Sequence, residues 1–260
     1  MKRGIILSDL HCGHRTGLTP PAHQYKKGGF KEKYYKVQKA CWNWYKDTLD
    51  RIGDVDIVMV NGDAVDGKGY RSGCSEQITT DMNEQCDIAR FCIHQALSKK
   101  TKLVMTKGTP YHTGEGEDFE ENIAEDLNAV EIGAHVFPRI EGVTFDLKHK
   151  VGSSGIPHGR ASAIKKAALW NKMWSEAGEQ PDAKVLIRSH VHYHQACYDP
   201  DFGWQMTTPA LQGFGSKYGS LQCEGRVHFG LIEFAVDGDE FSWKPHIAKL
   251  GVHKSKVVEL

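Results

Sequence analysis

The stretch Gly4-Ile5-Ile6-Leu7-Ser8-Asp9-Leu10-His11 joins a short apolar run to a carboxylate and an imidazole two residues apart. Residues i and i+2 of an extended strand point to the same side, so both side chains can reach one point where the strand ends. Asp offers a hard anionic oxygen and His a borderline nitrogen, a pair that suits Zn²⁺, Mn²⁺ or Fe. The stretch therefore predicts a buried strand that ends in metal ligands.

Two further stretches repeat this arrangement. Gly62-Asp63-Ala64-Val65-Asp66 follows a second apolar run, and Ser189-His190-Val191-His192 follows another. Ligand groups in open α/β sheets gather at the carboxyl ends of the strands. Three strand ends that each offer Asp or His side chains predict a dinuclear metal site.

Length and composition favour one soluble α/β domain. The chain has 260 residues, and Lys+Arg and Asp+Glu both number 33, so no net charge draws it toward nucleic acid or membranes. We expect a single domain over residues 1–260 and, because no apolar run approaches a membrane span or a signal peptide, no membrane partner. The seven Cys residues are scattered without a Cys-x-x-Cys pair, which favours a reducing, cytoplasmic location. The sequence does not indicate the oligomeric state.

Short apolar segments alternate with helical patterns in the first part of the chain. This alternation predicts βαβ units. We expect the strands to belong to one sheet and to cover residues 4–8, 56–61, 102–106 and 184–188. We expect the helices to cover residues 36–52, 81–99, 117–128 and 160–177.

The second half of the chain adds strand-like segments, and Asp237-Gly238 marks a hairpin turn between the last two. These segments predict a second, partly antiparallel sheet. The expected fold class is therefore α/β, a four-layer α/β/β/α sandwich of two mixed β-sheets flanked by helices. The segments are 135–137, 143–147, 205–208, 227–236 and 241–247.

Taken in order, these motifs together with His149 resemble those of the calcineurin-like metallophosphoesterases, over most of the chain. The resemblance implies two divalent cations, with Mn²⁺ favoured and Zn²⁺, Fe, Mg²⁺ or Ni²⁺ open. It implies that Asp63 bridges the cations and that Asp66 orients the Asp63 loop or a ligand imidazole. The remaining ligands that it implies are Asp9, His11 and His192 for one cation, and His149 and His190 for the other.

The resemblance also implies an activity, namely hydrolysis of phosphate esters by a hydroxide bound to both cations. A bridging carboxylate lets two cations lie about 3.5–4 Å apart, where they can clamp the attacking and leaving oxygens. The substrate would be a phosphate ester, with a phosphodiesterase or nuclease favoured. The alternatives are a phosphomonoesterase acting on protein or small molecules, and a catalytically impaired binding or scaffold member of the same fold.

One block departs from the family pattern. The family usually has Gly-Asn-His after the third strand, whereas this chain has Gly108-Thr109-Pro110-Tyr111-His112, a variant that resembles those of phage-encoded members. Thr109 stands where Asn would ligate the second metal, and His112 is displaced by two residues. We give His112 two roles with equal weight, proton donor to the leaving group or ligand of the second metal.

The chain offers an alternative to His149. His149 ends a predicted strand and is preferred over His158, which lies in the Gly/Ser-rich loop 152–159. That loop is either a phosphate-binding loop or a flexible connection. Arg160, directly after it, is a candidate substrate-binding residue.

A basic and aromatic segment follows the first motif. Residues 24–39 contain six Lys residues interleaved with aromatic rings, a composition used to bind single-stranded nucleic acid and equally found on solvated surfaces. Lys26 and Lys27 are its candidate substrate-binding residues, and nucleic acid is the partner that it would imply. Trp170, Met173 and Trp174 have helical spacing, and we expect them to belong to the core.

Overall fold

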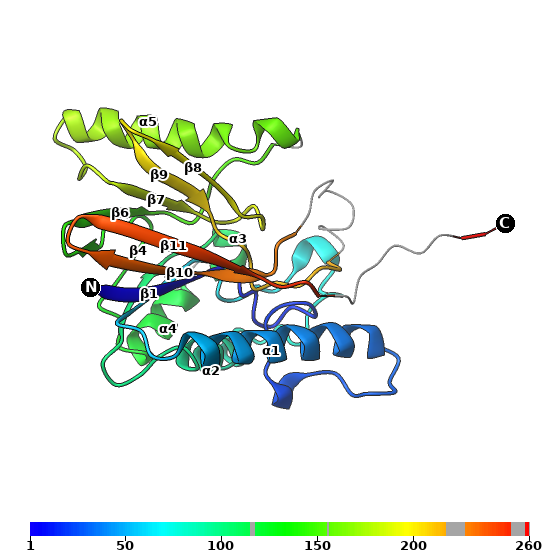
Figure 1. Ribbon diagram of the computed structural model, residues 1–260. Helices are drawn as coiled ribbons and strands as arrows, with labels where there is room; N and C mark the ends of the chain where they lie inside the picture. Colours follow the sequence, from blue (N-terminus) through cyan, green and yellow to red (C-terminus); the bar gives the residue numbers. More distant parts are fainter. Residues whose placement is uncertain (115–117, 155, 217–226, 251–257, 260) are drawn as a thin grey trace.

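Two β-sheets face each other between helices in the computed structural model, which describes residues 1–114, 118–154, 156–216, 227–250 and 258–259 (Figure 1). The first sheet has the strand order β11-β10-β1-β2-β3-β4. Strands β1 to β4 are parallel, while β10 and β11 run antiparallel to their neighbours. The bounds are Lys2–Leu7 for β1, Ile57–Asn61 for β2, Lys102–Thr106 for β3, Glu131–Gly133 for β4, Gly230–Asp237 for β10 and Glu240–Ile247 for β11.

The second sheet has the strand order β5-β6-β7-β9-β8. Its central strands β6, β7 and β9 are parallel, and antiparallel strands lie at both edges. Both sheets are therefore mixed, as expected. The bounds are Arg139–Ile140 for β5, Val143–Leu147 for β6, Val185–Arg188 for β7, Gln195–Asp199 for β8 and Gly203–Thr207 for β9.

Helices cover the outer face of each sheet, which confirms the four-layer α/β/β/α arrangement (Figure 1). In the part of the chain that the structure describes, three α-helices pack on the first sheet and one on the second, and α3 is a single turn after β3. Within the described ranges, no helix is both long and apolar enough to cross a membrane. The bounds are Glu32–Ile52 for α1, Met82–His94 for α2, Pro110–Thr113 for α3, Phe119–Asp126 for α4 and Ser162–Glu176 for α5. Residue 117, which the expected third helix included, lies outside the described residues.

The apolar strands of the first sheet are buried on both faces because they divide their side chains between two cores. In β1, Ile5 and Leu7 pack against the helices, while Ile6 points toward the second sheet. In β10, Leu231 faces the helices and Ile232 faces the other sheet. Full burial of each such side chain stabilises the fold by about 1.5–3 kcal/mol.

The assignment of strands to sheets differs from the expectation. The strand expected at 184–188 lies in the second sheet as β7, whereas β10 and β11 complete the first sheet. The reason is long-range pairing: β10 pairs with β1, at the opposite end of the chain, and this pairing leaves no local mark in the sequence.

Some local expectations were also wrong. Residues 135–137 form no strand and contribute only the isolated bridge of Val136 to Leu147. The short strands β4, β5 and β8 were missed. The hairpin at Asp237-Gly238 is confirmed, with Gly238 at a φ of 59° between β10 and β11.

The tryptophans of α5 correct a further expectation. Trp170 and Trp174 are 47% and 45% exposed, and Met173 is 50% exposed, so these side chains do not belong to the core. The buried side of α5 instead carries Ile164, Ala168 and Asn171, and the first two pack against Leu186 of the second sheet. Helical spacing indicates an apolar stripe but not the direction in which the stripe faces.

Candidate metal centre

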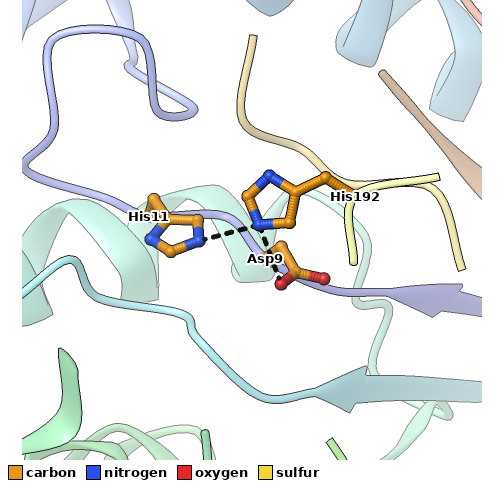
Figure 2. Close-up of side chains that lie close together, drawn as sticks. All are labelled: Asp9, His11 and His192. Carbon is orange, nitrogen blue, oxygen red and sulfur yellow. Dashed lines mark hydrogen bonds and ion pairs between the residues drawn. The ribbon is translucent and has the colours of Figure 1, made fainter. Parts of the chain in front are cut away.

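The first cluster of donor atoms comprises Asp9, His11 and His192, which follow β1 and β7. Nε2 of His192 lies 3.2 Å from Oδ1 of Asp9 and 3.3 Å from Nε2 of His11 (Figure 2). Two atoms that each lie about 2.1 Å from one tetrahedral ion are roughly 3.4 Å apart, so these separations suit a shared cation. The donor set of one carboxylate and two imidazoles suits a divalent transition metal.

The second cluster comprises Asp63, His149 and His190. Nδ1 of His149 donates to the carbonyl of Asn61 at 2.7 Å, and Nε2 lies 2.9 Å from Oδ2 of Asp63. Nδ1 of His190 lies 4.0 Å from the same oxygen. Within the described residues, the buried Nε2 of His149 makes no hydrogen bond. A buried ring nitrogen that faces a carboxylate without a hydrogen bond is a position that a cation would fill.

The two clusters adjoin each other around Asp63. Oδ2 of Asp63 lies 4.0 Å from Nε2 of His11, and Oδ1 of Asp9 lies 3.9 Å from Nε2 of His149. Asp63 therefore faces donor atoms of both clusters, the position required of a bridging carboxylate.

Opposite charges control the ionisation of this region. Burial by itself would raise the pKa of Asp9, but the neighbouring His192 lowers it to about 2. Burial likewise works against the charge of Asp63, yet His149 and His112 hold its pKa well below the ordinary value. Burial would lower the pKa of His149, but Asp63 and Asp9 raise it to about 10. The centre thus keeps Asp9 and Asp63 anionic and favours the protonated form of His149, whereas burial lowers the pKa of His11.

The backbone at the candidate ligands is unusual. Asp9, His11, Asp63, His190 and His192 have φ values between 46° and 73°, in the left-handed region that non-glycine residues rarely adopt. Such conformations concentrate at functional sites. Here they turn the backbone sharply after each strand, so that the side chains converge. Residue identity alone did not predict this geometry.

Two glycines allow the close approach of these loops. A Cβ on Gly62 would lie 2.5 Å from Nδ1 of His149, and a Cβ on Gly108 would lie 2.1 Å from Oδ1 of Asp63. Any side chain at either position would displace a candidate ligand. The glycines of both motifs are therefore required by packing at the centre.

Asp66 acts on the first cluster through His11. Its Oδ1 accepts a hydrogen bond from Nδ1 of His11 at 2.8 Å, which leaves Nε2 of that ring free to bind a metal. Oδ2 of Asp66 accepts a bond from Gln77 at 2.7 Å, and the backbone N–H of Asp66 donates to Gln85. Burial works to raise the pKa of Asp66, but His14 and His11 hold it below the ordinary value. Asp66 is therefore an anionic positioning residue.

His112 lies at the centre in spite of its displacement in the sequence. Its Nδ1 donates to the carbonyl of Asp66 at 2.6 Å, and its ring packs edge-on against His11 with centroids 4.7 Å apart. Nε2 of His112 lies 4.0 Å from Oδ2 of Asp63. The nitrogen that faces the centre is thus available to bind a metal or to carry a proton.

Thr109 contacts Asp63 directly. Its hydroxyl lies 2.9 Å from each carboxylate oxygen of Asp63, and its N–H donates to Oδ1 at 2.7 Å. The residue that stands in the place of Asn therefore holds the candidate bridging carboxylate.

Glu120 is a buried carboxylate that the sequence analysis missed. One oxygen accepts from the N–H of Ala64 at 2.7 Å and the other from the N–H of Gly108 at 2.5 Å. It therefore joins the loop after β2 to the loop after β3. Burial and the charge of Asp63 raise the pKa of Glu120 to about 8. The only signal in the sequence was a cluster of acidic residues at a helix start, which also has an ordinary structural explanation.

A chain of buried side-chain hydrogen bonds lies beneath the ligands and links both sheets. The hydroxyl of Thr208 lies 2.7 Å from those of Ser8 and Ser189. The amide of Asn61 donates to Ser189 at 2.7 Å and accepts from Thr106 at 2.7 Å. Ser189, the residue before His190, is therefore part of this support.

Arg160 and His158, which the sequence also singled out, belong to neither donor cluster. The guanidinium of Arg160 lies 4.7 Å from the ring centroid of Tyr193, the residue after His192. His158, the alternative to His149, is exposed in the 3-10 turn Pro157–Gly159. Residue 155 of the Gly/Ser-rich loop lies outside the described residues.

Lys26 and Lys27 are exposed in the loop before α1, and within the described residues neither side chain forms a hydrogen bond or ion pair with a candidate ligand. The segment is connected to the first motif indirectly. Gln38 accepts from the N–H of Tyr25 at 2.9 Å and donates to the carbonyl of Arg15 at 3.0 Å. The structure therefore places these lysines near the start of α1 rather than at the ligands.

No protein-family model matches the sequence, and no curated protein matches it. Solved structures with a similar fold include Zn²⁺-complexed Vps29 from Entamoeba histolytica, with 12% identity over 96% of this chain and 99% of that chain and a TM-score of 0.49. A predicted phosphoesterase from Streptococcus pneumoniae TIGR4 has 11% identity over 95% and 89%, with a TM-score of 0.42. A novel archaeal phosphodiesterase has 14% identity over 94% and 99%, with a TM-score of 0.43. At these identities, the similarity to Vps29 and to the phosphoesterases concerns the fold alone.

Proposed function

We propose that this protein is a metal-dependent phosphoesterase of the calcineurin-like type. The observation that carries the proposal is the pair of adjoining clusters, Asp9 with His11 and His192, and Asp63 with His149 and His190. Four imidazoles and two carboxylates at strand ends form a donor set for two divalent cations. Within the part of the chain that the structure describes, the buried Nε2 of His149 faces Oδ2 of Asp63 at 2.9 Å without a hydrogen bond, which supports a cation at the second cluster.

Two divalent cations, when bound, would polarise a phosphate and lower the pKa of a coordinated water. The side chains of the protein supply the remaining functions. Asp66 holds His11 in the tautomer that binds a metal, and Thr109 and Glu120 hold the loops around Asp63. Nε2 of His112 faces the centre, where it can give a proton to the oxygen of a leaving group.

We propose a phosphodiester, and nucleic acid in particular, as the substrate class. Support comes from stacked cations and rings beside the first motif. Arg15 and Lys33 lie over the ring of Tyr34, at 4.4 and 4.8 Å from its centroid, and Lys31 lies 4.7 Å from that of Tyr25. Phe30 is fully exposed in the same segment, available to stack on a base.

The central test measures metal content and turnover together. The purified protein would be loaded with Mn²⁺ and assayed on bis(p-nitrophenyl) phosphate, p-nitrophenyl phosphate, and single- and double-stranded oligonucleotides. We expect about two metal ions per chain and hydrolysis of the diesters. Asp63→Asn should abolish turnover, because it removes the anionic bridge, while the circular dichroism spectrum stays native.

The exposed Asp54 provides the matched control, since Asp54→Asn removes the same charge far from the centre. Wild-type turnover in a folded Asp63→Asn protein would contradict the assignment. Full metal occupancy without turnover of any phosphate ester would instead indicate a scaffold that keeps the fold and the metals.

The role of the basic segment can be separated from the chemistry. Lys26→Ala combined with Lys27→Ala should raise KM for oligonucleotides and leave the kinetics of bis(p-nitrophenyl) phosphate unchanged. The control is the exposed pair Lys99 and Lys100, replaced in the same way. Equal effects of the two double variants would remove the support for a nucleic-acid path.

A further inference from the structure

Helix α5 has a second apolar side, which faces away from the sheet. Its outer stripe, here called the Trp stripe, consists of Leu169, Trp170, Met173 and Trp174, each 45–50% exposed. The rings of Trp170 and Trp174 stack with centroids 6.5 Å apart. Figure 1 shows α5 at the edge of the molecule, and no described element lies over its outer side.

A continuous exposed patch of this composition is characteristic of a binding surface. Aromatic residues and Met are enriched where proteins meet, and four neighbouring apolar side chains on a helix suit another helix packed along it. Isolated exposed apolar residues are ordinary, but the stripe concentrates two tryptophans within one turn.

The charges at the ends of α5 indicate the orientation of the partner. Lys165 and Lys166 precede the Trp stripe, Glu176 follows it, and all three are exposed. Within the described residues, none of the three forms an ion pair. Lys165 and Glu176 are 11 residues apart, close to three helical turns, so they lie on the same flank of the helix.

A two-fold rotation brings these positive and negative charges of one copy opposite the reverse charges of a second copy. The stripe is centred between residues 171 and 172, and an antiparallel copy with its centre there places position 178 opposite Lys165. Glu176 lies two residues from that point, about 3 Å along the axis. The two-fold axis lies in the plane of the contact and is perpendicular to both helices. This rotation places the same flank of both helices on one side of the contact. Lys165 of each copy therefore meets Glu176 of the other.

We propose that two copies of this chain associate through α5, antiparallel and about a two-fold axis, with the Trp stripe at the centre of the contact. The surface is isologous, as in most homodimers, because each stripe packs on its own copy. Stable dimers bury about 800 Å² per partner, so the contact extends over the charged flanks, and we expect an affinity in the micromolar range. The proposal does not depend on the phosphoesterase assignment.

Sedimentation velocity of the full chain over about 1–100 μM tests the association. We expect the weight-average mass to rise from monomer to dimer with concentration. Trp170→Glu combined with Trp174→Glu should leave a monomer at every concentration, since it places four charges in the contact. Val130→Glu, at a single exposed apolar residue outside α5, is the control and should still dimerise.

Charge exchange tests the antiparallel geometry. Lys165→Glu and Glu176→Lys should each weaken the dimer by about tenfold or more, because each alters both symmetry-related ion pairs. The double variant should restore dimerisation. A chain that stays monomeric throughout, a dimer unaffected by the Trp variants, or a double variant no better than the single ones would each overturn the proposal. Circular dichroism verifies that every variant is folded.

Discussion

The two donor clusters use the same residue types but are supported differently. In the first, the carboxylate of Asp66 holds the imidazole of His11. In the second, the backbone carbonyl of Asn61 holds His149, and the hydroxyl of Thr109 contacts the carboxylate of Asp63. His190 is also the more exposed of the paired histidines, with 35% of its side chain accessible compared with 18% for His192.

This difference indicates unequal affinities for the two cations. A carboxylate partner makes an imidazole a more basic ligand than a neutral carbonyl does, and a partly exposed ligand loses more conformational freedom on binding. We therefore expect the first cluster to hold its cation more tightly than the second.

The largest effect is expected from removing one ligand of each cluster. His192→Ala and His149→Ala should each abolish turnover and remove about one metal ion per chain, because each deletes a donor from a small ligand set. Elemental analysis during titration with a chelator should show that His192→Ala retains only the weaker ion and His149→Ala only the tighter one. The exposed His158 and His94 are the controls. Metal loss on His158→Ala, rather than on His149→Ala, would reverse the choice between them.

A smaller effect is expected from His112. If it donates a proton, His112→Ala should slow esters with poor leaving groups by about 10²–10⁴-fold and spare an activated nitrophenyl ester, with unchanged metal content. If it binds the second cation, both substrates should slow alike and that ion should be lost. Unchanged rates together with unchanged metal content would exclude both roles.

Asp66→Asn should act on one cluster only. The amide cannot replace the anionic acceptor of the His11 ring, and loss of such a partner typically lowers metal affinity or activity by about 10–100-fold. Isothermal titration with Mn²⁺ should show weaker binding at the tight site and an unchanged weak site. Equal weakening at both sites would mean that Asp66 supports the whole centre rather than His11.

The smallest effect concerns the pH dependence of stability in the metal-free protein. The pKa of Glu120 is about 8 in the folded chain, above its ordinary value of 4.5. The folded state therefore binds more protons than the unfolded state between these values, and this group lowers the free energy of unfolding as pH rises from about 5 to 8. Glu120→Gln should remove that decline in urea titrations, while Glu125→Gln, at an exposed position of α4, should preserve it. Parallel pH profiles for Glu120→Gln and the wild type would contradict the assignment.

Much of the fold could be predicted from local patterns. Strands β1, β2 and β7 carry apolar runs rich in Ile and Val, and β3 and β6 begin and end where the sequence indicated. The partition of strands between the sheets could not be predicted, because β10 reaches the first sheet by pairing with β1 across nearly the whole chain. The outward direction of Trp170 and Trp174 was also missed, since Ile164 and Ala168 give α5 a second apolar side.

At the centre, the motifs indicated the candidate ligands but not the residues that hold them in place. Asp9, His11 and His192 lie together as the strand-end rule implies, because β1 and β7 end at one side of the paired sheets. Glu120 was missed because its importance depends on two backbone N–H groups from distant loops. The hydrogen bonds of Ser189 and Thr208 likewise depend on the meeting of two sheets, which no local spacing encodes.

The left-handed backbone at five of the six candidate ligands lowers the stability of the fold at the residues on which the proposed function depends. Each such residue costs about 1 kcal/mol relative to an ordinary conformation, less where Asp or His tolerates the geometry well. Five of them amount to several kcal/mol, comparable with the entire free energy of unfolding of a typical domain. Glycine at any of these positions would relieve the backbone and make the chain more resistant to heat while destroying a ligand. A search for thermostable variants that does not also select for turnover would therefore replace these ligands first.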